Sequence, residues 1–324
     1  MNKPTGFQVP SRLAAAPSPL WDVSVSGSHS GGGVASLPKP ALEVAEPALL
    51  PALLPFRPVQ PRIHAEVGRY RLRLAESVAD RDAVCRLRFK VFNIELGKGL
   101  DASYRTGLDA DQFDLFCEHL LVEDKLADEG SARRIVGTYR MQSGATAAQN
   151  LGYYSEQEFD LSPYEHMRGE ILELGRASID REHRTPEVLT LLWRGIAQYA
   201  TDMQLRYLIG CSSLNSADPR EGWQMYAQLD HYRVAEELRT VPMAGFVCPA
   251  DIPTNHDEQD LGTEAVESSV KVPKLLKTYL AIGARICGAP AWDREFGTID
   301  FLTLMDLRTI SSSARNRFLA PLTQ

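Results

Sequence analysis

Hydrophobic and polar positions divide the chain into an unpatterned segment and a patterned one. From about residue 66 onward, apolar positions recur with a period of two or with helical spacing, which predicts strands and helices. Predicted strands lie at 70–75, 118–123, 134–142, 171–180, 205–213, 231–241 and 299–305. Predicted helices lie at 77–92, 187–203, 218–229 and 272–285. Strands interleaved with helices are typical of an α/β fold.

The first 65 residues lack this pattern. Eleven of the twenty prolines lie in the first 61 positions, beside runs of glycine and serine, and such a composition cannot bury enough apolar surface to offset its ordering entropy. We predict a disordered arm at 1–65 and one folded domain at 66–324, which starts near Tyr70 and ends in a helix–strand extension. Prolines interrupt the apolar stretch 41–56, which favours a loose or weakly interfacial arm over a helix.

Composition excludes several classes of function. A net charge of −7 gives no support to nucleic-acid binding, which normally needs a basic excess. We expect a cytoplasmic protein, open to peripheral contact with the inner face of the membrane, because no apolar run reaches the ~18 residues that span a bilayer and no signal peptide is evident. Five widely spaced cysteines form no zinc or disulfide pattern, so we expect reduced thiols and no metal site.

Candidate chemistry is concentrated in the predicted strand 171–180. Glu173, Gly175 and Arg176 interrupt its apolar run, and strand alternation should point Glu173 and Arg176 to opposite sides. A bulge at Gly175 would bring both side chains to one cleft and would leave a backbone N–H free to bind an oxyanion. This predicts an acyl-transfer site with Glu173 as general base. A partly buried ion pair on an ordinary strand is the alternative.

The connection at 93–115 gathers acidic side chains before the next predicted strand. Two interpretations remain open, a solvated acidic loop and a lid held over an amine substrate by carboxylate–guanidinium forks. The acids are Asp109, Asp111, Asp114 and Glu118, and the candidate arginines are Arg86, Arg88 and Arg140.

An ordered set of motifs carries a family resemblance over residues 68–310. The motifs are 86–92 (RLRFKVF), 111–114 (DQFD), 117–122 (CEHLLV), 136–140 (VGTYR), 153–160 (YYSEQEFD), 171–180 (ILELGRASID) and 191–195 (LLWRG). The set resembles the L-ornithine N-alpha-acyltransferases (lyso-ornithine lipid synthases), which are similar in turn to acyl-homoserine lactone synthases. The resemblance implies a GNAT-type acyl-CoA N-acyltransferase fold, a mixed central sheet flanked by helices, in which strands 171–180 and 205–213 part to open a thioester slot.

The resemblance also implies a function and its residues. The expected reaction moves a (3-hydroxy)fatty acyl group from acyl carrier protein to the α-amine of L-ornithine, without a cofactor. Glu173, Gly175 and Arg176 are the implied catalytic residues, with Arg176 orienting Glu173 or holding the substrate carboxylate. The amino-substrate side is implied to comprise Arg88, Phe92, Asp111, Asp114 and Arg140.

A departure from coenzyme A acetyltransferases concerns the acyl donor. Those enzymes hold pyrophosphate with a glycine-rich loop after the catalytic strand, whereas this chain has Arg181, His183 and Arg184 there. An arginine-bearing rim suits an acidic acyl carrier protein, and we predict docking at Arg181, Arg184 and Lys277. A charged helix-start loop without a partner is the alternative.

Two other functions remain open at this stage. One is an acyl-homoserine lactone or other N-acyl amino acid synthase, which shares the same arginine, aspartate and Glu-x-x-Arg framework. The other is a non-catalytic module that binds acyl carrier protein or a membrane.

Overall fold

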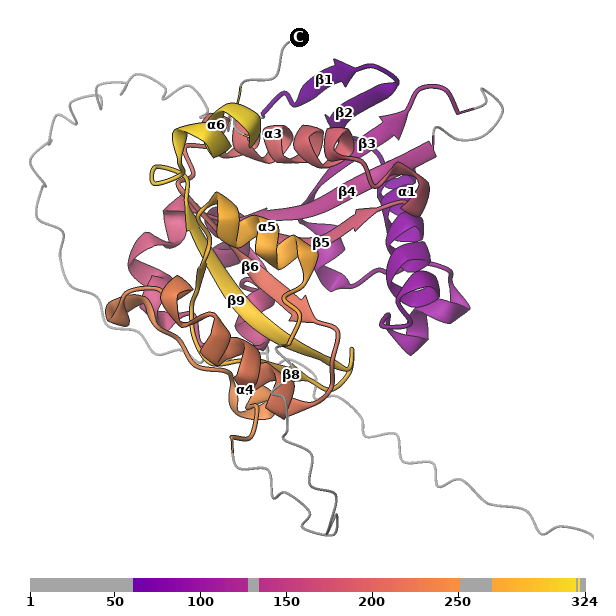
Figure 1. Cartoon of the computed structure of the whole chain (residues 1–324). Helices are drawn as coiled ribbons and strands as arrows, with labels where there is room; N and C mark the ends of the chain where they lie inside the picture. The colour runs from indigo at the N-terminus through magenta and orange to yellow at the C-terminus, as the bar shows by residue number, and fades with distance from the viewer. Residues whose placement is uncertain (1–60, 128–133, 251–269, 319, 321–324) are drawn as a thin grey trace, which may run out of the picture. The chain divides into compact units, whose positions relative to one another are not determined.

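A mixed β-sheet forms the centre of the described chain (Figure 1). The computed structural model describes residues 61–127, 134–250, 270–318 and 320, all within the unit Arg57–Gln324. Only β5 and β6 pair in parallel, and every other strand pair among these residues is antiparallel. The order is β1-β2-β3-β4-β5-β6-β9-β7, with β8 paired to β9. The strands are β1 His64–Val67, β2 Tyr70–Leu74, β3 Glu118–Asp124, β4 Arg134–Ser143, β5 Ile171–Ile179, β6 Tyr207–Leu214, β7 Arg285–Ile286, β8 Ala291–Asp293 and β9 Thr298–Asp306.

The helices begin at capping residues that the sequence supplies. The hydroxyl of Ser77 caps the first of them, and Thr185 caps the longest, which has Pro186 in its first position. A π-helix, Lys90–Glu95, extends the first helix. The helices are α1 Val78–Phe89, α2 Gly144–Gln149, α3 Pro186–Asp202, α4 Pro219–Gln228, α5 Lys274–Ile282 and α6 Ser312–Phe318.

Alternation along β3 shows how helices cover both faces of the sheet. Leu120 and Val122 belong to the core cluster that contains the buried face of α3, whereas Leu121 packs with α1. Because neighbouring strand residues point to opposite faces, α1 and α3 lie on opposite sides (Figure 1). The α/β class and the mixed, helix-flanked sheet are therefore confirmed.

The parallel pair β5–β6 is short, and its end creates an opening in the sheet. Register runs from Ile171 opposite Tyr207 to Glu173 opposite Ile209 and then stops, so β5 has no β6 partner from Leu174 onward. Gly210 lies at this point, where a Cβ atom would come within 2.3 Å of the Leu174 carbonyl oxygen. The predicted parting of these two strands is confirmed, and glycine is required where they diverge.

Several boundaries differ from the sequence prediction. Ordered structure begins before Tyr70, because β1 pairs along β2 and buries Ile63 and Ala65. The rest of the predicted arm, the turn at 128–130 and the acidic excursion at 251–268 lie outside the described residues. The predicted strand 231–241 is wrong, since two 3-10 turns interrupt it and it makes only isolated bridges. The predicted C-terminal extension is part of the sheet, because β9 pairs along the whole of β6.

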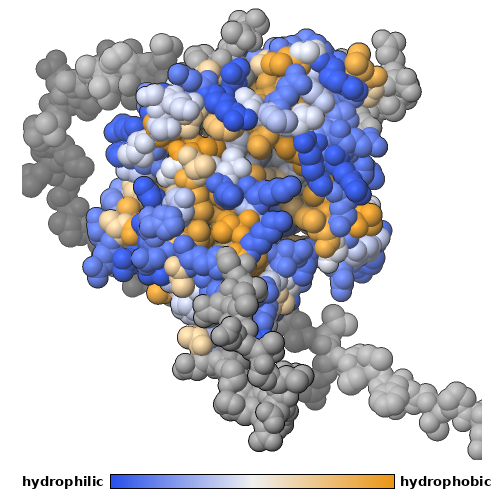
Figure 2. Space-filling view, in the orientation of Figure 1, coloured by the Kyte–Doolittle hydropathy of each residue, from blue (hydrophilic) through white to orange (hydrophobic). Residues whose placement is uncertain are grey.

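Hydrophobic residues form one patch on the surface of this unit (Figure 2). In Figure 2, hydrophobic residues gather in the middle of the face on which α5 lies against β5 and β6, with hydrophilic residues around them. Within the described residues, no helix is both long enough and apolar enough to cross a membrane.

We predict that Gly210→Ala lowers the free energy of unfolding by about 1–3 kcal/mol, because the new methyl group would overlap the Leu174 carbonyl. Urea unfolding measures the change. Gly175→Ala is the matched control, since its Cβ would meet nothing within 4 Å, and its stability should stay within about 0.5 kcal/mol of wild type. Equal stability of the two variants would contradict this account of the strand junction.

Candidate active site

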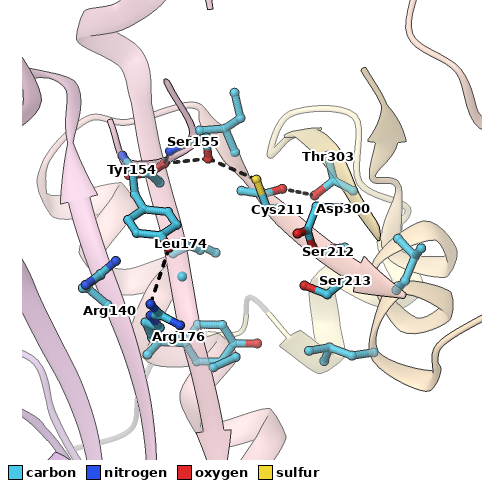
Figure 3. Close-up of a pocket in the computed structure, with 18 of the residues that line it drawn as sticks. Arg140, Tyr154, Ser155, Leu174, Arg176, Cys211, Ser212, Ser213, Asp300 and Thr303 are labelled. Carbon is cyan, nitrogen blue, oxygen red and sulfur yellow. Dashed lines mark hydrogen bonds between the residues drawn. The ribbon is translucent and has the colours of Figure 1, made fainter. Parts of the chain in front are cut away.

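A cavity of about 370 Å³ lies where β5 and β6 part (Figure 3). Its lining includes Trp193 of α3, from the core cluster on one face of the sheet, and Ile209 of β6, from the core cluster on the other. The cavity therefore passes between the strands and joins the two faces. Leu276 and Tyr279 of α5 also line it.

A bulge on β5 sets the direction of the side chains in this cavity. Arg140 pairs with Gly175 and Thr138 with Ser178, so a step of two residues on β4 matches a step of three on β5. Glu173 and Arg176 consequently both line the cavity, as predicted. The bulge lies one residue beyond its predicted place, because Arg176, with φ of 49°, takes the left-handed conformation. The missing side chain of Gly175 instead leaves open space at the cavity wall.

Glu173 is a buried carboxylate held by three donors. Its Oε2 accepts from the backbone N–H of Tyr154 at 2.8 Å, and its Oε1 accepts from the N–H and hydroxyl of Ser155, both at 2.7 Å. Burial raises the pKa of Glu173, and the Ser155 and Tyr154 hydrogen bonds offset only part of that effect. A carboxylate has about four lone-pair sites, so one acceptor site remains for a ligand.

Arg176 lies within a group of aromatic rings on the same wall. Its guanidinium carbon is 4.8 Å from the ring centre of Phe296, 5.4 Å from that of Tyr154 and 5.7 Å from that of Phe92. Its hydrogen bond among the described side chains is a long one, 3.4 Å from Nη2 to the Tyr154 hydroxyl, and Nε has no acceptor. No hydrogen bond or ion pair joins Arg176 to Glu173 within the described residues, so the suggestion that Arg176 orients Glu173 finds no support in this geometry.

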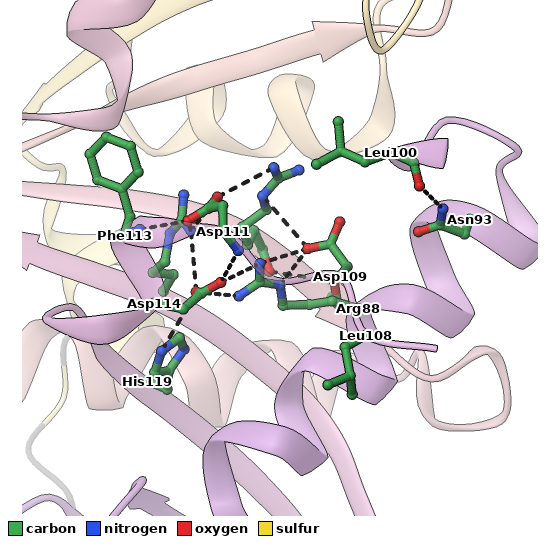
Figure 4. A network of polar contacts seen from close by, with 12 residues as sticks. Arg88, Asn93, Leu100, Leu108, Asp109, Asp111, Phe113, Asp114 and His119 are labelled. Atoms are coloured by element: carbon green, nitrogen blue, oxygen red, sulfur yellow. Dashed lines mark hydrogen bonds and ion pairs between the residues drawn. The ribbon is translucent and has the colours of Figure 1, made fainter. Parts of the chain in front are cut away.

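Two further arginines form an ion-pair network behind this wall (Figure 4). Arg88 is fully buried and donates to Asp109 at 2.8 Å and to Asp114 at 2.6 Å, while Arg140 donates to Asp111 at 2.7 Å. Burial alone would raise the pKa of Asp114, but the Arg88 and Arg140 guanidinium groups outweigh burial and hold that pKa far below its ordinary value.

The predicted amino-substrate residues divide into two groups. Arg140 and Phe92 line the cavity, whereas Arg88, Asp111 and Asp114 do not. Asp111 and Asp114 pair with Arg140, and Asp114 also pairs with Arg88. The predicted carboxylate–guanidinium forks are present in the 93–115 connection, which contains the 3-10 turns Asp101–Arg105 and Gln112–Leu115. Movement of this connection as a lid stays a prediction. Arg86 and Glu118 are exposed and stay outside the network.

The predicted docking residues are all exposed. Arg181 follows β5, and Lys277 lies on α5, whose neighbouring residues line the cavity. Arg184 pairs with Glu95 at 2.5 Å, so it is not a free charge in this structure. His183 points inward, with Nδ1 3.0 Å from the Tyr70 hydroxyl, and is a core histidine rather than a rim residue.

Sequence reasoning missed several cavity residues. Tyr154 and Ser155 bind Glu173 through their backbone N–H groups, which no side-chain pattern could reveal. Three acids also line the cavity, and one of them had a visible signal, because Asp300 interrupts the apolar run of β9. The other missed side chains in the lining include Glu158, Cys211, Asp293 and Phe296.

Comparisons with known proteins identify the family. The acetyltransferase (GNAT) domain model matches residues 87–194, which span α1 to α3 and contain the β5 bulge. L-ornithine N(alpha)-acyltransferase of Brucella abortus (strain 2308) is 32% identical over 259 residues, covering 77% of this chain and 89% of that protein. The chain belongs to the L-ornithine N(alpha)-acyltransferase family.

Another member, from Agrobacterium fabrum (strain C58), is 32% identical over 257 residues, covering 77% of this chain and 85% of that protein. The predicted family resemblance, the GNAT fold and the assignment as an acyltransferase are thereby confirmed. Among solved structures, FeeM, an N-acyl amino acid synthase from uncultured soil microbes, is 13% identical with a TM-score of 0.43, covering 78% of this chain and 97% of that one.

We predict that Arg176→Gly is more stable than Arg176→Ala by about 1 kcal/mol, because only glycine takes a left-handed conformation without strain. Both variants lose the guanidinium, so the comparison isolates the backbone. Thermal unfolding of the two proteins measures the difference. An equal or reversed order would show that position 176 is not held at positive φ.

Proposed function

We propose that the protein transfers a fatty acyl group from acyl carrier protein to the α-amine of L-ornithine. The observation that carries the proposal is that a buried carboxylate, Glu173, and a guanidinium, Arg176, both line one wall of a cavity that passes through the sheet. The relatives at 32% identity are named for acylation of this amino acid. The carrier-bound donor, its 3-hydroxy group and peripheral contact with a membrane belong to the same proposal.

Arg176 supplies the contact for the α-carboxylate of the amino acid. A guanidinium presents five N–H donors in a planar fork, and most of those of Arg176 have no acceptor among the described side chains. The surrounding rings restrict the side chain and exclude water, which strengthens a charged pair. Asp109 and Asp111, at 3.8 and 3.6 Å, hold the guanidinium from behind.

Glu173 accepts the proton that the substrate ammonium must lose before attack. Its raised pKa makes it a stronger base than an ordinary glutamate, while its three donors fix the carboxylate in one orientation. The proton transfer is direct or passes through one bound water. The free amine then attacks the thioester carbonyl carbon.

The remaining steps use the backbone of β5. As the carbon–nitrogen bond forms, the carbonyl oxygen becomes an anion, and N–H groups at the bulge beside Gly175 are the proposed donors. Collapse of the intermediate breaks the carbon–sulfur bond. The attacking nitrogen loses its second proton as the amide forms, and the leaving pantetheine thiolate gains one and departs as the thiol. The balance of atoms requires no metal or redox cofactor.

The cavity cysteine gives no reason to invoke an acyl-enzyme. Burial raises the pKa of the Cys211 thiol well above its ordinary value, and the nearby carboxylate of Glu158 raises it further. Cysteine attacks thioesters as the thiolate, so a protonated Cys211 is a poor nucleophile. Direct transfer from carrier to amine is the simpler route.

The function is tested by incubating the purified protein with 3-hydroxyacyl carrier protein and L-ornithine and analysing the product by mass spectrometry. Nα-acylornithine is the expected product. A lactone, or a requirement for S-adenosylmethionine, would assign the protein to a different acyl transfer.

We predict that Glu173→Gln lowers acyl transfer on the order of 100-fold or more at neutral pH, because an amide cannot accept the ammonium proton. The raised pKa of Glu173 also places the acid limb of the wild-type rate profile above about 4.3, the ordinary glutamate value. Activity should therefore fall as the pH drops through this raised pKa. Glu165→Gln, on an exposed 3-10 turn, is the control. Near-normal turnover by a folded Glu173→Gln protein would exclude the base role.

We predict that Lys277→Glu raises the KM for acyl carrier protein, and that added salt reduces the difference, because an exposed charge on α5 acts mainly on association. Lys277 is a cleaner test than Arg184, whose reversal would also break the pair with Glu95. Acyl-pantetheine turnover is the measurement that separates docking from chemistry, and Arg86→Glu, an exposed charge outside the cavity lining, is the control. Equal losses with both donors would rule out docking at Lys277.

A further inference from the structure

Three buried carboxylates meet in the wall of the cavity opposite the arginines. Glu158, Asp293 and Asp300 each bring a carboxylate oxygen within 4.8 Å of the other two. Their exposed fractions are 4%, 6% and 3%, and all three side chains line the same cavity as Glu173 and Arg176. Figure 3 shows Asp300 with Ser212 and Ser213 across the cavity from Arg140 and Arg176.

This cluster differs from the other acids of the site because it lacks a cation. Among the described residues, no arginine, lysine or histidine nitrogen lies within 4.0 Å of any of the three carboxylates, whereas Asp109, Asp111 and Asp114 all have arginine partners. Oε2 of Glu158 and Oδ1 of Asp300 accept no hydrogen bond from the part of the chain that the structure describes. Buried carboxylate oxygens without donors are costly, so the cluster has the character of a site for a positively charged ligand.

The surrounding contacts fix the carboxylates without neutralising them. Asp293 Oδ1 accepts from the backbone N–H groups of Glu295 and Phe296 at 2.9 and 3.0 Å, and Asp300 Oδ2 accepts from the Thr298 hydroxyl at 3.1 Å. Lys98 also lines the cavity, but its ammonium donates to the Gly297 carbonyl at 2.8 Å. Asp293 and Asp300 are therefore oriented in advance of any ligand.

The shifted pKa values agree with an uncompensated site. Burial raises the pKa of Asp300 to about 6 and that of Glu158 well above its ordinary value, and the neighbouring carboxylates add to both effects, while hydrogen bonds and the more distant Arg176 guanidinium offset only part of them. A bound cation would oppose these shifts and favour the ionised forms. Binding at pH 6 should therefore release protons to the solvent.

We propose that Glu158, Asp293 and Asp300 form the subsite for the side-chain ammonium of a diamino acid substrate. The assignment rests on the proposed function and extends it to substrate selection. Arg176 on one wall and the acidic cluster on the other give the cavity two opposite charges, which match the α-carboxylate and the distal ammonium of one amino acid. The α-amine then lies between them, on the side of Glu173.

An alkylammonium fits the cluster better than a divalent ion. Its three N–H donors equal the number of carboxylates, and it leaves no coordination position to be filled by other ligands. Calcium takes 6–8 oxygen ligands and magnesium about six in a near-octahedral arrangement, so three carboxylates would leave either ion dependent on several waters. A metal site is accordingly an outcome that the experiment must separate.

The test compares L-ornithine with L-norvaline, which is ornithine without its side-chain amine. Binding to the full-length protein is measured by calorimetry, and acyl transfer by product analysis. Wild-type protein should prefer ornithine in kcat/KM on the order of 10- to 100-fold, as expected for loss of a buried charged contact. Asp300→Asn and Glu158→Gln should remove most of this preference by raising the KM for ornithine, with a much smaller change in kcat/KM for norvaline.

Asp306→Asn is the matched control, because it removes a carboxylate from the same strand that pairs with Arg206 instead. If wild type uses ornithine and norvaline equally well, or if the variants keep its preference, the subsite assignment is wrong while ornithine acylation stands. Loss of activity with a chelator, restored by one divalent ion, would also overturn it in favour of a metal site. Absence of acylornithine from wild-type reactions would instead refute the proposed function. Should either variant fail to fold, the wild-type comparison and Asp293→Asn still decide the outcome.

Discussion

The extra residue in β5 is the constraint on which the rest of the site depends. Strand alternation would send Glu173 and Arg176 to opposite faces of the sheet, and the bulge brings them to one cavity. The strain of a left-handed arginine is retained because the Tyr154 and Phe296 rings surround its guanidinium and two aspartates lie behind it. The parting of β5 from β6 begins at the next residue after Glu173, so the same short stretch both opens the cavity and equips its wall.

Charge in the buried site is separated rather than balanced locally. The arginine–aspartate network behind β5 is closely paired, since Arg88 and Arg140 between them contact Asp109, Asp111 and Asp114. Across the cavity, Asp293 and Asp300 are held in place without a counter-ion among the described residues. A zwitterionic substrate with a second ammonium would bind both walls at once, because its carboxylate matches the arginine on one wall and its second ammonium matches the carboxylates on the other.

The sequence was sufficient for the class of fold and for the strand whose Glu173 and Arg176 line the cavity, because both depend on local signals. Capped helices and apolar strands are visible in the residue pattern, and an acid and an arginine around a glycine suggested the bulge. The residue at the bulge that takes the left-handed conformation was not predictable, since Gly175 was expected to do so and Arg176 does so instead.

The acidic cluster could not be predicted from spacing, because Glu158 precedes β5 while Asp300 lies on β9, and only the sheet order brings them together. The predicted strand 231–241 is wrong for a related reason. Its residues alternate between apolar and polar as a strand would, but in the structure they form only isolated bridges, to Ile286 and Gly288.

Two opposing effects act on the pKa of Glu173. Three donors from the 3-10 turn Tyr154–Gln157 favour the ionised carboxylate, while complete burial favours the protonated one and has the larger effect on its pKa. The hydrogen bonds that fix the carboxylate also fix the turn, and the turn carries Tyr154, whose ring lies between Arg140 and Arg176. Any change that moves the turn therefore alters the surroundings of Glu173 and Arg176 together. Backbone contacts that are invisible in the sequence thus couple the two residues that the sequence singled out.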